Sequence, residues 1–207
     1  MRITQEAKLA TGQRILETAA RLFATSGWEN TTTREIAAAA GIATGTLFNY
    51  FPCKEAIAAT LISDALQRAE QEFTSRAFED ASLEEDLFTF IWTGLKSLRD
   101  CRAFLAPAAE TLFSPLARSS PDRSGDAIRV RHLEMVEQIV AAHCGNEPLR
   151  AVTMQLYWTL FLGVFAYWAA DASPNQEDTL ALLDQSLKLF VQSLDRKGEN
   201  HDQRKPE

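Results

Sequence analysis

Gly41 stands between two short segments of helical periodicity, and this arrangement restricts the possible folds more than any other feature of the chain. The first segment, TTTREIAAAA, offers a threonine cap, Glu35 in its first turn, and Ile36 and Ala40 on one face. The second, TGTLFNYF, stops at Pro52, because the residue before a proline avoids the α region. Gly41 suits a turn position that needs a positive φ. The pattern therefore predicts two short helices joined by a tight turn, a helix-turn-helix.

The second short helix carries the side chains of a DNA reader. In a helix-turn-helix this helix enters the major groove, and Ile42 and Leu47 are expected to pack it against the first helix. Hydroxyl and amide groups can then meet phosphates or base edges, and a glycine lets the backbone approach DNA closely. One such threonine alone is more typical of a helix cap or a turn, so the joint spacing carries the interpretation. The outward positions are Thr44, Gly45, Thr46, Phe48, Asn49 and Tyr50.

Charge is distributed unevenly along the chain. The net charge of the 207 residues is −7, but residues 1–54 hold six Lys/Arg against four Glu. The remaining residues hold 15 Lys/Arg against 24 Asp/Glu. This asymmetry is consistent with a first segment that faces a polyanion.

Helical patterns continue through almost the whole chain, and neither β alternation nor an internal repeat is found. Pro107 is expected to kink or shorten one helix, and a Ser/Pro/Gly-rich loop is expected at 114–125. The chain is therefore predicted to be all-α. A first helix is expected in GQRILETAARLFATSG (12–27), where Gly27 stops it. After the helix-turn-helix, the expected helices are 54–76, 82–99, 102–113, 126–143, 148–171 and a last one that residues 173–176 cap and that reaches 195.

Residues 14–61, RILETAARLFATSGWENTTTREIAAAAGIATGTLFNYFPCKEAIAATL, resemble the N-terminal domain of TetR (tetracycline repressor-like) transcriptional regulators. The shared features are LF near the end of the first helix, then TT, REIA, AG, GTL, an aromatic residue, YF and KE. The resemblance implies an N-terminal arm and DNA-binding domain at 1–53. It also implies a helical ligand-binding and dimerisation domain at 54–195, with 54–76 as the linking helix, and a polar tail at 196–207.

The resemblance extends the DNA-contacting set beyond the second short helix. It implies backbone contacts from Thr33 and Arg34 and a phosphate contact from Lys54, whereas Leu47 and Phe51 match buried positions. Three positions depart from the usual pattern of the family. Thr44 replaces a long polar residue, Phe48 replaces tyrosine, and Cys53 replaces a better capping residue.

The resemblance also implies a homodimer on a palindromic operator in double-stranded DNA, and control by a small-molecule effector. An aromatic-rich, mostly apolar site suits an apolar or aromatic ligand with one or two polar groups. The candidate effector residues are Phe88, Trp92, Phe104, Phe113, His132, Met135, Trp158, Phe161 and Phe165. The candidate dimerisation residues, which periodicity alone also permits in an intramolecular core, are Leu180, Leu183, Leu187, Phe190 and Leu194.

Several other interpretations were weighed. The uncharged segment 151–170 is long enough to span a bilayer, but its polar residues and the absence of flanking basic clusters favour burial. His132, His143 and Cys144 match no zinc spacing, and a redox role for Cys53 stays open. An odd number of cysteines and a polar N-terminus favour the cytoplasm.

The sequence offers no convergent catalytic set, and neither an enzymatic activity nor a cofactor is expected. A helical carrier or interaction module would not explain residues 31–54. The sequence therefore predicts a ligand-responsive regulator, most simply a repressor. A regulator whose C-terminal domain only dimerises is the alternative.

Overall fold

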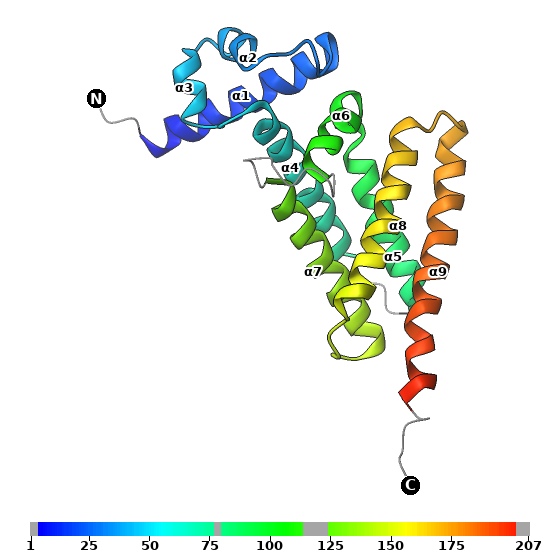
Figure 1. The fold of residues 1–207 in the computed structure, drawn as a ribbon. Coiled ribbons are helices and arrows are strands. Elements are labelled where there is room, and N and C mark those ends of the chain that lie inside the picture. Colours follow the sequence, from blue (N-terminus) through cyan, green and yellow to red (C-terminus); the bar gives the residue numbers. More distant parts are fainter. Residues whose placement is uncertain (1–3, 77–79, 114–123, 202–207) are drawn as a thin grey trace. The chain divides into compact units, whose positions relative to one another are not determined.

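A computed structural model describes residues 4–76, 80–113 and 124–201, with side chains described as far as Leu194. The predicted all-α fold is confirmed, and the described residues form no β-strand (Figure 1). The helices are α1 Gln5–Ser26, α2 Thr33–Ala39, α3 Thr44–Phe48, α4 Lys54–Thr74, α5 Leu83–Ser97, α6 Arg102–Phe113, α7 Ser124–Cys144, α8 Ala151–Ala170 and α9 Glu177–His201, with short 3-10 helices at Arg99–Cys101 and Pro174–Gln176.

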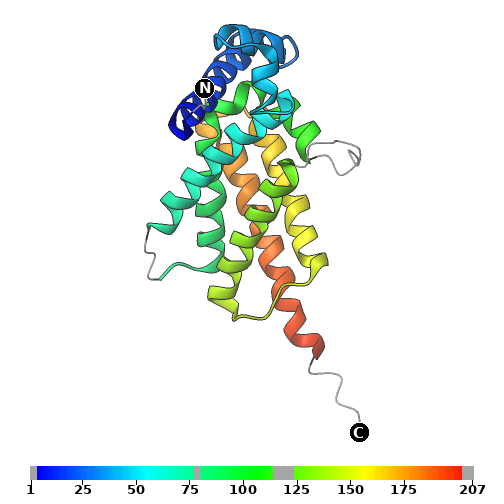
Figure 2. The ribbon, with the colours of Figure 1, turned by 90° about the vertical axis from the view of Figure 1, so that its left-hand side faces the viewer.

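The chain forms two compact units. The N-terminal unit comprises Met1–Arg68 and Ser97–Val130, and the C-terminal unit comprises Ala69–Lys96 and Arg131–Glu207. Helices α4, α5 and α7 each contribute residues to both units. Within the C-terminal unit, α8 and α9 lie side by side (Figure 1 and Figure 2).

The core of the N-terminal unit is built on one face of α1. Ile15, Ala19 and Phe23 recur every four residues and are fully buried. The ring of Phe23 packs against Phe104 of α6, with 4.9 Å between the ring centroids. Helix α6 continues through Pro107, which was expected to kink or shorten it. A proline in this position removes one backbone hydrogen bond without ending the helix.

The core of the C-terminal unit follows equally regular stripes. Leu83, Leu87, Ile91 and Leu95 are buried along α5 at steps of four residues. The connection between α8 and α9 is closed by Asp171, whose carboxylate accepts hydrogen bonds from the backbone N–H groups of residues 173 and 179 at 2.7 and 3.1 Å.

Two helices are longer than the sequence pattern indicates. Helix α1 begins at Gln5, because Thr4 caps it by accepting a hydrogen bond from the N–H of Ala7 at 3.2 Å. Helix α9 continues to His201, beyond the expected end at 195. The extra residues at the start of α1 and at the end of α9 form no apolar stripe, so the sequence pattern does not predict that they are helical. Most of the loop expected at 114–125, and the last residues of the expected tail, lie outside the described residues.

The uncharged segment that suggested a possible span forms α8. Among the helices in the described part of the chain, none combines the length and apolar character needed to cross a bilayer. Polar side chains interrupt α8, and Tyr157 and Trp158 are buried within the chain.

Candidate functional site

The turn between α2 and α3 has the geometry that the sequence predicts. Helix α2 starts with a capping box in which the Thr32 N–H donates to the Glu35 carboxylate at 2.8 Å, and the Glu35 N–H donates to the Thr32 hydroxyl at 3.2 Å. The backbone hydrogen bond from Thr32 is the main reason why the pKa of Glu35 is lowered. At its other end, Gly41 has φ +68°. The N–H groups of Gly41 and Ile42 donate to the carbonyls of residues 38 and 37, which forms a Schellman motif.

Helix α3 presents a mixed polar and aromatic surface. Leu47 is fully buried, while Gly45, Phe48 and Asn49 are exposed. Thr44, Thr46 and Tyr50 are half-buried. The helix ends at Phe48, so Asn49 and Tyr50 lie in the turn after it and not within the helix as expected. The N–H groups of residues 50 and 51 both donate to the carbonyl of Leu47 at 2.9 Å, and Pro52 prevents the helix from continuing.

Lys54 makes contacts within the chain. Its ammonium group donates a hydrogen bond to the carbonyl of Trp28 at 2.8 Å and lies 4.3 Å from the centroid of the Trp28 ring. A cation above an indole face is attracted by the ring quadrupole. The ring of Trp28 also stacks on Phe104 of α6, with 6.4 Å between the centroids. Lys54 therefore joins the start of α4 to the segment between α1 and α2.

The residue before Lys54 caps helix α4. The N–H of Ala56 donates to the sulfur of Cys53 at 3.4 Å. Sulfur is a weak acceptor, which agrees with the expectation that cysteine caps poorly. Cys53 is half-buried.

A second candidate site lies around His132 in the C-terminal unit. Its Nε2 atom is 2.8 Å from the hydroxyl oxygen of Tyr157. The rings of Phe161, Phe90 and Trp158 surround the imidazole, with centroid distances of 4.2, 5.1 and 5.9 Å. Burial lowers the pKa of His132 to about 3 and raises the pKa of Tyr157 well above its ordinary value. His132 is therefore neutral at pH 7, inside an aromatic cluster.

A small cavity adjoins this cluster. A cavity of about 10 Å³ lies between α5, α8 and α9, where Tyr157, Phe161 and Ser186 form part of its wall. This volume is about that of one water-sized probe. A separate open groove of about 330 Å³ is lined by Ser82, Glu84, Glu85, Phe88, Thr89, Asp184 and Leu187.

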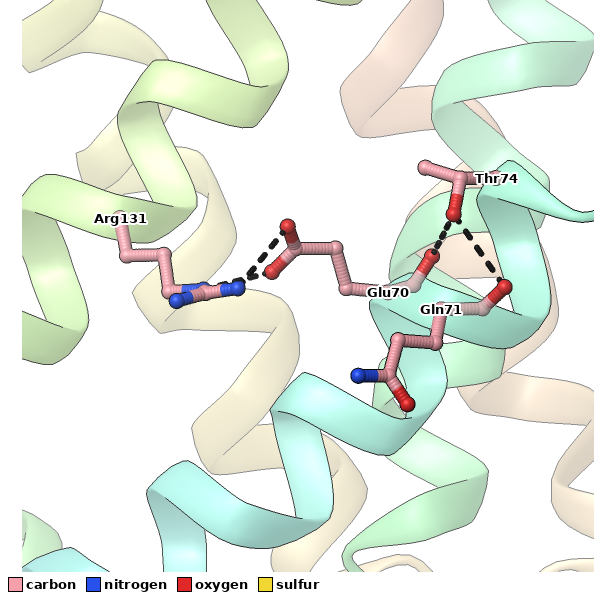
Figure 3. Close-up of polar contacts among 4 residues, drawn as sticks. All are labelled: Glu70, Gln71, Thr74 and Arg131. Atoms are coloured by element: carbon pink, nitrogen blue, oxygen red, sulfur yellow. Dashed lines mark hydrogen bonds and ion pairs between the residues drawn. The ribbon is translucent and has the colours of Figure 1, made fainter.

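The last turns of α4, which belong to the C-terminal unit, contact α7 and α5 at two points. The guanidinium of Arg131 on α7 forms two hydrogen bonds to the Glu70 carboxylate, at 2.7 and 3.2 Å (Figure 3). One turn further along α4, the ring of Phe73 lies 5.5 Å from that of Phe90, which contacts His132. Because Arg131 and His132 are adjacent on α7, both contacts lead to the aromatic cluster.

The outer faces of α8 and α9 expose apolar side chains. Val152 and Leu156 on α8 are 64% and 42% exposed, and Leu189 on α9 is 60% exposed. Tyr167 and Leu182 are also exposed. Three of the five predicted dimerisation residues, Leu183, Leu187 and Phe190, are instead buried inside the chain, and Leu180 and Leu194 are half-buried.

Comparison with known families identifies the family of this chain. Residues 15–61 match the model of bacterial regulatory proteins of the tetR family. Residues 86–201, more than half of the chain, match the tetracyclin repressor-like C-terminal domain. The chain belongs to the TetR family. Members of this family are transcriptional regulators that bind DNA through a helix-turn-helix, and residues 33–48 form this motif here.

Solved TetR-family structures share the fold. FadR of Thermus thermophilus in complex with lauroyl-CoA is 24% identical, with 87% of this chain and 93% of that chain covered and a TM-score of 0.67. A TetR transcriptional regulator of Rhodococcus sp. RHA1 is 19% identical, with 89% and 97% covered and a TM-score of 0.67. FadR of Bacillus subtilis in complex with stearoyl-CoA is 22% identical, with 86% and 97% covered and a TM-score of 0.57. A search of curated proteins found no significant match.

The structure brings together only some of the effector residues expected for this TetR-family chain. His132, Trp158 and Phe161 are in mutual ring contact, and Phe165 follows at 6.1 Å from Phe161. Met135 is buried on the same helix as His132. The others lie elsewhere: Phe88 in the open groove, Phe104 in the core of the N-terminal unit, Phe113 half-buried on α6 and Trp92 half-buried on α5.

Sequence reasoning missed Phe73, Phe90 and Tyr157. Phe90 falls on the buried stripe of α5 together with Leu83 and Leu87, so helical periodicity could have separated it from Phe88. Tyr157 could not have been assigned this way, because α8 is apolar on most sides and its pattern identifies no face.

The two histidines considered as metal ligands have different partners in the structure. His143 lies 2.7 Å from a carboxylate oxygen of Asp86, and His132 faces Tyr157. No group of three or more possible ligands occurs among the residues that the structure describes.

Proposed function

We propose that this TetR-family chain is a cytoplasmic transcriptional repressor. It binds a palindromic operator as a homodimer and leaves the operator when a small effector with an apolar or aromatic body binds the C-terminal unit. The observation that supports this proposal most directly is the α2–turn–α3 motif, which exposes Gly45, Phe48 and Asn49 on a family-matched domain. A dimer would supply two such motifs to the two half-sites.

The DNA interface is proposed to divide into backbone and base contacts. Thr33 and Arg34 at the start of α2 would contact the sugar-phosphate backbone, and Asn49 would read a base edge. Lys54 can still reach a phosphate, since an ammonium group has three protons and Trp28 accepts only one hydrogen bond from it. The remaining proposed contacts are Thr44, Gly45, Thr46, Phe48 and Tyr50.

A lysine at position 44 is expected to strengthen DNA binding. Thr44 cannot neutralise a phosphate, so Thr44→Lys should steepen the dependence of log K on log salt by roughly 0.9 per subunit. Filter binding or fluorescence anisotropy at four salt concentrations measures this slope. Ala24→Lys adds the same charge at an exposed position of α1 and should leave the slope unchanged. Equal slopes for the two variants would contradict the proposed interface.

The effector is proposed to bind at the cluster around His132. A neutral imidazole hydrogen-bonded to Tyr157 offers one polar partner within otherwise aromatic walls, which suits a ligand with an apolar body and one polar group. An acyl chain has this character, and two regulators of the same fold are solved with lauroyl-CoA and stearoyl-CoA. Since the adjacent cavity is about 10 Å³, the half-buried Phe161 would have to move to admit such a ligand.

A titration with several probes tests this assignment. Lauroyl-CoA, free laurate and benzoate would be added to the operator complex while DNA release and tryptophan fluorescence are recorded. Trp158 lies 5.9 Å from His132, so an effector should change both signals over the same concentrations. Trp158→Phe should remove most of the fluorescence change. If none of a wider panel of apolar compounds changes either signal, the C-terminal unit serves dimerisation alone.

The Glu70–Arg131 pair is proposed to transmit effector binding to α4. A ligand biases DNA binding only through its different affinities for two arrangements, so the contact between α7 and α4 has to differ between them. Arg131→Ala should therefore reduce the effector-induced loss of operator affinity, with little change in operator binding itself. Because exposed ion pairs contribute up to about 1 kcal/mol, the reduction should be up to about fivefold.

A charge exchange provides the control for this contact. The double variant Glu70→Arg with Arg131→Glu should recover part of the response that each single variant loses. Arg76→Ala, which breaks an ion pair between Glu72 on α4 and Arg76 just after this helix, should respond as the wild type does. A full response in Arg131→Ala would exclude the pair from the coupling.

A further inference from the structure

The first turns of α1 precede the part of the chain that matches the TetR family model. The match begins at residue 15, whereas α1 begins at Gln5. This added segment, residues 5–14, is helical, and Thr4 caps it. The nine proposed DNA contacts include none of its residues.

The added segment of α1 lies against the end of the DNA-reading segment. A Cβ atom placed on Gly12 would be 3.7 Å from Cδ1 of Tyr50, so the Tyr50 ring packs next to the bare backbone of α1. Tyr50 follows α3 directly, and the start of α1 and α3 are neighbours in the N-terminal unit (Figure 1). The part of α1 before Gly12 therefore lies next to the proposed DNA interface.

The side of α1 that meets Tyr50 carries one exposed lysine in this added segment. At 100° per residue, Lys8 lies about 40° around the helix from Gly12, and Thr4, Gln5 and Thr11 are on the same side. Glu6, by contrast, lies roughly opposite Lys8. Lys8 is exposed. One face of the segment thus combines Lys8 with neutral polar residues and the exposed Leu9, and has no carboxylate.

The proposed interface is otherwise poor in positive charge. Among the nine proposed DNA contacts, Arg34 and Lys54 are the cations, and the Lys54 ammonium already bonds to Trp28. Protein–DNA affinity depends strongly on the number of phosphates that Lys and Arg neutralise. A further cation beside Tyr50 would neutralise one more phosphate and so raise the affinity for DNA.

We propose that Lys8 contacts a DNA phosphate close to the proposed Tyr50 contact, so that the added segment of α1 extends the interface along the backbone. This inference rests on the proposed function. It assigns the segment to DNA because its face presents an exposed lysine without a carboxylate and adjoins Tyr50 at Gly12. The contact is to the backbone, so it should strengthen binding to all sequences nearly alike.

Salt-dependent binding of three lysine variants tests the inference. Lys8→Ala and Lys8→Gln should each lower the slope of log K against log salt by roughly 0.9 per subunit, and Lys8→Glu should lower the affinity further. Arg21→Ala is the matched control, since Arg21 is exposed on the same helix but lies about 140° away from Lys8. Its slope should equal that of the wild type. Helix content by circular dichroism confirms that each variant is folded.

The outcomes separate this inference from the proposed function. Wild-type slopes in both Lys8→Ala and Lys8→Gln would overturn it, and so would an equal decrease in Arg21→Ala, because the effect would then be one of net charge. An absence of any DNA binding by the wild type at low salt would instead overturn the proposed function. Phosphate ethylation interference gives an independent readout: one interfering phosphate of the wild type should stop interfering with Lys8→Ala.

Discussion

The double variant Leu182→Glu with Leu189→Glu is expected to be monomeric and to lose operator binding by at least two orders of magnitude. Both side chains are exposed on α9, and Val152 and Leu156 are exposed on the adjacent α8. We expect these exposed apolar side chains to contribute to the dimer interface, and two buried carboxylates per subunit would oppose its closure. Without the dimer, each half-site would be bound separately, and the gain from simultaneous binding would disappear.

Analytical ultracentrifugation and operator titration measure the two parts of this prediction. Gln138→Glu adds a carboxylate at an exposed position of α7 and should remain dimeric. Leu187→Glu and Phe190→Glu are unsuitable for this test, because these side chains are 4% and 0% exposed and a carboxylate there would unfold the chain. A dimer that survives in the Leu182/Leu189 variant would place the interface on another surface.

Acidification is expected to destabilise the fold through His132. Its pKa is lowered from 6.5 to about 3 by burial. Between these values the unfolded chain binds a proton that the folded chain does not, so stability falls as the pH decreases. Once the pH is well below 6.5, the contribution of His132 lowers the free energy of unfolding by about 1.4 kcal/mol for each pH unit of further acidification within that range.

The double variant His132→Leu with Tyr157→Phe isolates this contribution. It removes both hydrogen-bonding partners together, so neither polar group is left buried alone. Urea unfolding at pH 7, 6, 5 and 4 should show a shallower decrease in stability for the variant than for the wild type. Carboxylates titrate in both proteins and cancel in the comparison. Equal pH dependence would mean that His132 becomes protonated in the folded state.

The helix-turn-helix was predicted almost completely because its signals are local. On both sides of Gly41, the apolar periodicity of a helix is visible within one or two turns. Thr32 and Glu35, which cap α2, are only three residues apart. Local reasoning failed at Asn49, where the helix had already ended. It also failed at Gln5, where a polar helix start produces no periodic signal.

Sequence by itself determined the all-α class, the position of the reading motif and the family, since each depends on residues close together in the chain. Only the tertiary structure decided which partner each side chain meets. The stripe that includes Leu183 and Leu187 is equally periodic whether it faces its own core or a second subunit, and the structure buries it within the chain. Likewise, Lys54 meets Trp28, and His132 meets Tyr157, 26 and 25 residues apart along the chain. Contacts at such separations depend on how whole helices pack against one another. The periodicity of one segment shows which face is buried, but it does not show which other segment covers that face.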